Sequence, residues 1–244
     1  MCAVRTIPEQ VIEQLQNIGS TTVSNAIEQF DVRTRNEGFV SGRAARCMFP
    51  QFTPKIGYAV TASIRTSSTP IAGRYYYDRI DWWSYVQSMP APRFLVVQDI
   101  DHMPGVGALF GKIHASIAVA LQCVAYLSNG AVRDLPVMEA SGLQVFAGSV
   151  AVSHAYAHIT EFGEPVEIGG LRIKPGDLLH GDQHGVVSIP LSIASEIPKR
   201  AAEISEAEQQ LIEFCQSKDF TLDRLAEYLR RLSKQTGIPG RDSR

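Results

Sequence analysis

The sequence is poor in cysteine, lacks long apolar runs and carries almost no net charge. The cysteines form no CxxC pair, which argues against a disulfide framework or zinc knuckle; they are Cys2, Cys47, Cys123 and Cys215. No uncharged apolar run reaches the roughly 18 residues of a membrane-spanning helix, and the first ten residues lack the apolar core of a signal peptide. The 23 basic residues nearly balance the 25 acidic ones, which leaves no electrostatic footprint for nucleic acid or an anionic membrane. We therefore expect a cytoplasmic protein with no direct nucleic-acid or membrane partner.

The remaining composition is that of an ordinary globular protein, with 244 residues of which 45% are hydrophobic. Apolar residues at helical spacing predict one helix that ends before Gly19 and a second that Ser20, Thr21 or Thr22 caps. Two strands are expected at 39–48 and 58–64. A strand at Phe94–Val97, a helix at Leu109–Leu121 and a strand at Cys123–Leu127 then form a βαβ unit. The pattern predicts an α/β fold.

The last third of the chain changes from strands to helices. Residues 150–190 predict a β-rich segment with a hairpin turn at Gly169–Gly170. Ser192 is placed to cap a long amphipathic helix at Ile193–Gln216, and a further helix is expected at Thr221–Leu232. We expect a single domain over residues 1–244, with a core at about 20–210 and C-terminal helices at about 192–234 that pack on a neighbouring subunit.

Two segments of the βαβ unit carry a candidate anion site. Gly105–Gly111 leads from one strand into a helix N-terminus, where backbone N–H groups suit a carboxylate or phosphate. Asn129–Asp134 leaves the next strand at the same edge of the sheet, so Arg133 and Asp134 should face the same crevice. A guanidinium offers a planar fork for a carboxylate, and an aspartate can ligate Mg²⁺. A structural Arg–Asp pair at a turn explains the same spacing equally well.

Other polar and aromatic motifs favour structural roles. Asp177 and Asp182 lie at turns of the β-rich segment. We expect Asp177 to fix its turn, and Asp182 is either structural, which we favour, or functional. The histidine pairs His154 with His158 and His180 with His184 have a spacing of four residues but no third metal ligand nearby, which argues against zinc. The aromatic segment Tyr75–Trp83 is either a loop pinned by packing on the core or part of a site or subunit contact.

Three features of the chain together resemble the RraA-like family of ribonuclease E regulators and 4-hydroxy-4-methyl-2-oxoglutarate aldolases. They are the turn Asn129–Asp134, the strand that follows it, and the block Pro175–Pro190 with two Gly-Asp pairs. The resemblance implies a swivelling β/β/α-type domain, assembly as homotrimers or homohexamers, and active sites at subunit interfaces. It further implies a lyase that cleaves a 4-hydroxy-2-oxo acid to pyruvate and decarboxylates oxaloacetate with Mg²⁺ or Mn²⁺.

The resemblance also assigns roles to individual residues. Arg133 would bind the pyruvyl group, and Asp134 would hold the metal. The substrate would lie against the four residues Gly111, Lys112, Ile113 and His114. A glutamate from the C-terminal helix of a neighbouring subunit would assist, for which Glu208 is the best match and Glu203 and Glu206 are competitors.

One position departs from the pattern of the family's aldolases. They carry an acidic residue where this chain has Lys112, and an ammonium group repels a cation that a carboxylate would attract. Lys112 either weakens the metal site, stabilises an enolate itself or points to solvent. The departure keeps open the alternative of a non-catalytic regulator that binds an RNA-processing enzyme such as ribonuclease E.

Overall fold

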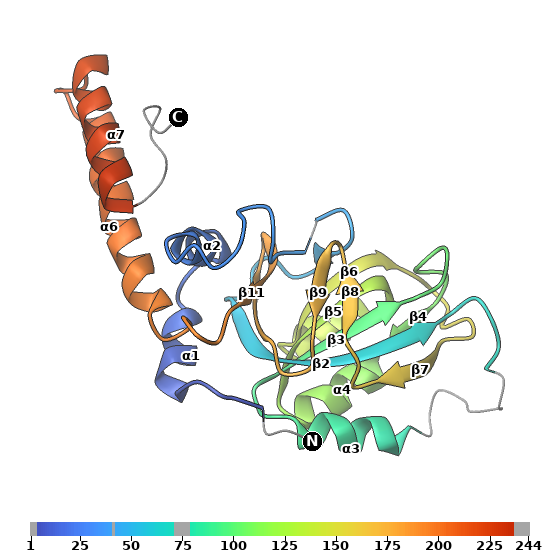
Figure 1. Ribbon diagram of the computed structural model, residues 1–244. Coiled ribbons are helices and arrows are strands. Elements are labelled where there is room, and N and C mark those ends of the chain that lie inside the picture. Colours follow the sequence, from blue (N-terminus) through green and yellow to red (C-terminus); the bar gives the residue numbers. More distant parts are fainter. Residues whose placement is uncertain (1–3, 41, 71–78, 237–244) are drawn as a thin grey trace.

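A twisted mixed sheet forms the centre of the protein, with parallel pairing among its central strands and helices at both ends of the chain (Figure 1). The structure is a computed structural model that describes residues 4–40, 42–70 and 79–236. The order in the sheet is β1-β6-β5-β3-β2-β10-β11, with β4 beside β5 and β7 beside β2. Its strands are β1 (Arg46–Cys47), β2 (Lys55–Arg65), β3 (Arg93–Asp99), β4 (Ala108–Phe110), β5 (Cys123–Val132), β6 (Gln144–Val150), β7 (His158–Phe162), β10 (Leu178–Asp182) and β11 (Gly185–Ile189). The hairpin β8 (Val166–Ile168) and β9 (Leu171–Ile173) forms a second sheet.

The middle of strand β3, Phe94–Val97, is apolar because both faces of the sheet are covered there. Its side chains alternate, so Phe94 and Val96 join one core cluster while Leu95 and Val97 join another. A third cluster forms where the terminal helices pack on β2, β10 and β11. The helices are α1 (Glu9–Leu15), α2 (Ser20–Glu28), α3 (Ile80–Ser88), α4 (Lys112–Ala120), α5 (Leu135–Ala140), α6 (Ile197–Gln216) and α7 (Leu222–Thr236). The α/β fold with helical termini is confirmed.

Several element boundaries differ from the sequence predictions. Within 39–48 the strand is only β1, with one isolated bridge from Phe39 to Val187. The expected helix 109–121 is two elements, because extended backbone at Gly111 separates β4 from α4. Helix α6 begins at Ile197 rather than at 193, with Pro198 in its first turn, where a missing N–H costs no helical hydrogen bond. Its N-cap is Glu196, not Ser192.

The N-terminus of α2 is held by a carboxylate from another part of the chain. Its N-cap is Gly19 rather than a hydroxyl residue, and Ser20 instead donates its N–H and its hydroxyl to Asp182 at 2.7 and 2.6 Å. The backbone N–H of His184 donates to the same carboxylate at 2.8 Å. Burial alone would raise the pKa of Asp182, but these hydrogen bonds outweigh it and lower that pKa. Asp182 has the structural role that its turn predicted.

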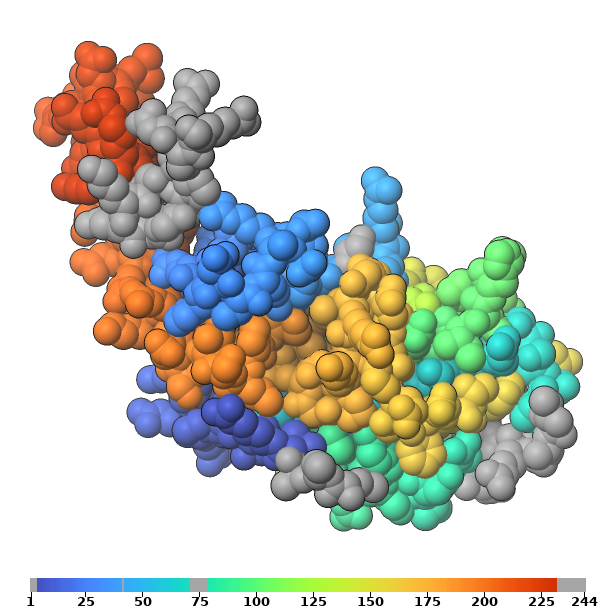
Figure 2. Space-filling model, in the orientation of Figure 1, coloured from blue at the N-terminus to red at the C-terminus, as the bar shows by residue number. Residues whose placement is uncertain are grey.

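The last two helices form an arm that projects from the body (Figure 2). Within the arm, Phe214 of α6 stacks on Tyr228 of α7 with ring centroids 4.5 Å apart. None of the helices in the described part of the chain is long and apolar enough to cross a membrane.

Replacing Asp182 by alanine should lower the free energy of unfolding by about 2–3 kcal/mol, because the buried Ser20 donors lose their acceptor. Chemical denaturation measures the change. The control is Glu13→Ala, which removes an exposed carboxylate from α1. Equal midpoints for the two variants would show that Asp182 does not anchor α2.

Candidate functional site

The edge where β4 and β5 end brings the predicted site residues together. The two strands run parallel with Phe110 paired to Val132, so the residues after them leave the sheet side by side. The backbone N–H of Arg133 donates to the carbonyl oxygen of Phe110 at 3.2 Å. Strand β5 extends to Val132 and does not end at Leu127 as predicted, so Arg133 and Asp134 lie immediately beyond it. The structure therefore brings the two predicted segments together at one edge of the sheet, although β4 was not foreseen.

Gly111 lies in the closest contact of the site. A Cβ atom at this position would lie 2.8 Å from Asp134 Oδ2 and 3.1 Å from Arg133 Nε, inside contact distance for both. The close approach lets the backbone N–H of Lys112 donate to Asp134 Oδ2 at 3.0 Å. Arg133 Nε lies 3.9 Å from the same oxygen. The carboxylate of Asp134 is thus held between a helix N-terminus and a guanidinium.

The first turn of α4 points its backbone donors at this edge. The first N–H groups of a helix have no acceptor within it, and here the N–H of Lys112 donates to Asp134. The helix dipole adds partial positive charge at the same end. Asp134 itself adopts a left-handed conformation with φ 62°, which turns the chain from β5 into α5. The edge is therefore suited to an anion.

His114, in the first turn of α4, is a buried ring. The side chain is 7% exposed and lies against Trp83 and Phe110, with ring centroids 5.7 and 5.9 Å away. Burial, and secondarily the charge of Arg133, lowers the pKa of His114 to about 4. The imidazole is consequently neutral at pH 7.

Of the aromatic segment Tyr75–Trp83, the structure describes the part that includes Trp82 and Trp83. Trp83 lies on α3 and packs on His114, while its neighbour Trp82 is 3% exposed in the core. Residues 71–78 lie outside the described residues, so the prediction for Tyr75–Tyr77 stays a prediction.

A carboxylate network that sequence reasoning missed supports the neighbouring strand end. Asp99, at the end of β3, accepts hydrogen bonds from the N–H groups of Gly105 and Asp101 at 2.8 and 3.1 Å. The side-chain amide of Asn129 on β5 accepts a hydrogen bond from the backbone N–H of Asp99 and donates one to its carbonyl oxygen. Burial raises the pKa of Asp99 despite these bonds. The network fixes the loop between β3 and β4; the sequence signal for it is an aspartate at a strand end followed by Gly105.

The other predicted site residues lie elsewhere. Glu203, Glu206 and Glu208 are on α6, which projects away from β4 and α4 (Figure 1). The structure therefore does not bring Glu208 to Arg133 within one protomer. His180 is fully buried with its ring against the carbonyl oxygens of Leu15 and Ile18. Its role is structural.

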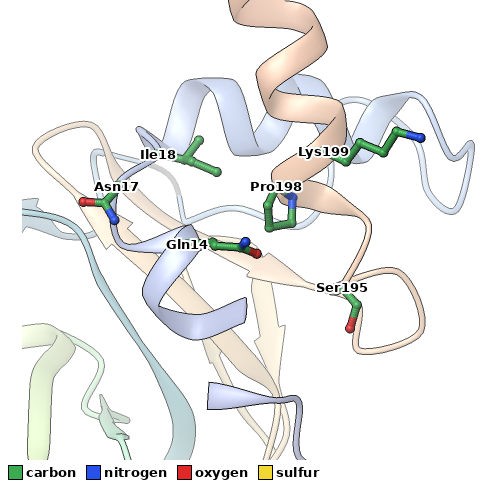
Figure 3. Close-up of a pocket in the computed structure, with 6 residues that line it drawn as sticks. All are labelled: Gln14, Asn17, Ile18, Ser195, Pro198 and Lys199. Carbon is green, nitrogen blue, oxygen red and sulfur yellow. The ribbon is translucent and has the colours of Figure 1, made fainter. Parts of the chain in front are cut away.

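A hollow of about 470 Å³ lies apart from this edge (Figure 3). Its walls come from α1, the turn after it and the start of α6, and they are Gln14, Asn17, Ile18, Ser195, Pro198 and Lys199. The lining holds no carboxylate, histidine or cysteine. The residues predicted to act on a substrate therefore lie at the edge where β4 and β5 end, and not at this hollow.

The donor set at the edge does not fit a Mg²⁺ or Mn²⁺ ion within one protomer. Across the described ranges, no three histidine, cysteine, aspartate or glutamate side chains come together where they could hold a metal. Asp134 is the carboxylate that the resemblance assigns to the metal, yet its Oδ2 faces a backbone donor and Arg133. Lys112 occupies the position where the resemblance expects an acid. These groups together attract anions.

Comparisons with curated proteins find two relatives. A Halalkalibacterium halodurans protein, provisionally named 4-hydroxy-4-methyl-2-oxoglutarate aldolase, is 28% identical over 95 residues, 38% of this chain and 45% of its own. Protein DlpA of Legionella pneumophila is 22% identical over 208 residues, 84% of this chain and 31% of its own. The matches thus span less than half the length of either relative.

Solved structures share the fold at low identity. An uncharacterized protein of Pseudomonas syringae has a TM-score of 0.72 at 19% identity, over 95% of this chain and 98% of that one. Streptomyces coelicolor RraAS2, described as an unusual member of the RNase ES inhibitor RraA protein family, has a TM-score of 0.66 at 19% identity, over 84% of this chain and 97% of that one.

The family model described as RraA-like, Aldolase/RraA, matches residues 20–188. This range contains β2 to β10 and the whole edge from Gly111 to Asp134. Because the match covers more than half of the sequence, the chain belongs to the RraA-like family.

Proposed function

We propose that the protein is a carbon–carbon lyase that cleaves a small 4-hydroxy-2-oxo acid to pyruvate at the edge formed by β4 and β5. The observation that carries the proposal is the convergence of the α4 N-terminus, Arg133 and Asp134 around Gly111. Membership in a family described as Aldolase/RraA supports the same chemistry. Decarboxylation of oxaloacetate would use the same site, because it passes through the same pyruvate enolate.

Arg133 and the first turn of α4 would bind the acid end of the substrate. The side chain of Arg133 is a quarter exposed, and its planar fork matches a carboxylate or the pair of oxygens of a 2-oxo acid. The N-terminus of α4, which begins at Lys112, adds backbone donors and partial positive charge that suit an anion. Binding would orient C2 of the substrate toward Arg133.

Cleavage requires a base at the 4-hydroxyl and a stabilised oxygen at C2. A water held by Asp134 would take the hydroxyl proton, the bond between C3 and C4 would break, and its electron pair would move onto the C2 oxygen. C4 would leave as a carbonyl, and the water would return the same proton to C3 of the enolate to give pyruvate. Donors already aimed at the developing charge stabilise the enolate without reorganisation.

Glu208 would act from a second copy of the chain. Helix α6, which carries the half-buried Glu208, projects from the body, and this supports a contact with another protomer rather than with its own site. The proposal therefore includes an assembly, a homotrimer or homohexamer, in which each site is completed by the neighbouring arm.

A regulatory role is the second candidate. Lys112 departs from the acidic residue of the family's aldolases, and the projecting arm offers a surface beyond the sheet. A protein without pyruvate-forming activity that retains ribonuclease E in a pull-down would fit this role instead.

Arg133→Ala should lower kcat/KM for pyruvate formation by roughly 10² to 10³-fold, because the donor to the carboxylate and enolate is lost. A dehydrogenase-coupled assay with a 4-hydroxy-2-oxo diacid measures it. Arg172→Ala, which removes an exposed arginine from β9, is the matched control. Unchanged activity in Arg133→Ala would place the chemistry elsewhere.

Mixing two inactive variants tests the shared site. Arg133→Ala and Glu208→Ala should each be inactive alone, and subunit exchange should restore about one quarter of the wild-type activity, because one site in four combines both intact residues. A mixture that stays inactive after exchange, shown by mass spectrometry, would remove Glu208 from the site.

The neutral His114 predicts a pH dependence of stability. Its pKa is about 4 folded and about 6.5 unfolded, so the unfolded state binds the proton first as pH falls. Stability should fall between pH 6.5 and 4, with His114 contributing about 3 kcal/mol. Urea unfolding of wild type and His114→Gln across this range measures the difference.

His180 has its pKa lowered by burial in the same direction, so part of the slope should remain in His114→Gln. Identical pH slopes for the two proteins would show that His114 is not buried in the neutral form.

A further inference from the structure

We propose that Lys112 supplies, as an ammonium group, the positive charge that a divalent cation would otherwise place at the enolate oxygen, so that this site binds its anion without a metal. The inference rests on the proposed lyase function and goes beyond it, because it assigns a residue to the charge of the transition state.

The position of Lys112 follows from the backbone around it. It is the first residue of α4, and its own N–H lies 3.0 Å from Asp134 Oδ2. Side chains in a helix lean toward its N-terminus, which here is the edge that holds Gly111 and Arg133. The side chain is exposed, so its four-carbon stem is free to turn toward a ligand beside Asp134.

The charges at the edge make it a site for anions. Lys112, Arg133 and the α4 N-terminus are positive, His114 is neutral, and Asp134 is the carboxylate between them. A divalent cation would join two cations around a single carboxylate. The ligand of matching charge is a small planar dianion, with a carboxylate beside an enolate oxygen.

Oxalate has this shape and charge, and its binding reports on the site without turnover. We would measure it by titration calorimetry on the full-length protein, in EDTA and in Mg²⁺, for wild type, Lys112→Met, Lys112→Asp and Lys199→Met. Lys199 is the matched control because it lies on α6, beside the separate hollow. Far-ultraviolet circular dichroism checks that each variant folds.

Wild type should bind oxalate equally in EDTA and Mg²⁺, within about twofold. Lys112→Met should bind about tenfold more weakly or worse in EDTA, because a charge-assisted hydrogen bond is lost. Lys112→Asp should bind only when Mg²⁺ is present, since the acid rebuilds a cation site. Lys199→Met should behave as wild type.

The inference is overturned if wild type binds oxalate only with Mg²⁺, if it does not bind at all, or if Lys112→Met matches Lys199→Met. The proposed function fails separately: wild type would then form no pyruvate, or Arg133→Ala would keep full activity. Pyruvate formation that depends on Arg133 but not on Lys112 would sink this inference alone.

Discussion

The parallel pairing of β4 with β5 is the constraint on which the site depends. It makes two segments more than twenty residues apart in sequence leave the sheet at one edge. The separation there is so small that position 111 has no room for a Cβ atom. A larger residue would push Arg133 and Asp134 away from the α4 N-terminus and break the hydrogen bond to Lys112. Everything proposed for the chemistry follows from this contact.

The electrostatics of the edge follow from the same contact. Asp134 brings negative charge to a place where a helix dipole and a guanidinium are already positive, so the three largely compensate one another. His114 remains neutral because it is buried against Trp83 and Phe110 and lies near Arg133. The ammonium group of Lys112 then leaves the edge with an excess of positive charge for a ligand to neutralise. This is why an anion suits the edge better than a metal ion.

The sequence predicted the βαβ unit and its edge well because apolar periodicity and glycine placement are local signals. It did not predict β4, because the apolar residues of a three-residue strand directly before a helix continue the apolar pattern of that helix. It missed the network of Asp99 with Asn129, whose partners lie thirty residues apart. The structural role favoured for Asp182 is confirmed. Ser20, Thr21 and Thr22 were the candidate caps of α2, and only the fold shows that Gly19 is the N-cap and that Ser20 donates to Asp182. The single-domain boundaries and the role of Glu208 stay predictions.

Fold and chemistry are separable in this site because they depend on different parts of neighbouring residues. Gly111 is constrained by its missing side chain, and Asp134 by its backbone turn and carboxylate. Lys112 contacts Asp134 through its backbone N–H, whereas its side chain is exposed. An acid, an amide or a base at position 112 can therefore make the same hydrogen bond to Asp134 and leave the edge in place. The charge of that one side chain then decides whether the edge attracts a cation or an anion. Membership in the RraA-like family therefore determines the scaffold, but not whether a metal ion or an ammonium group stabilises the enolate.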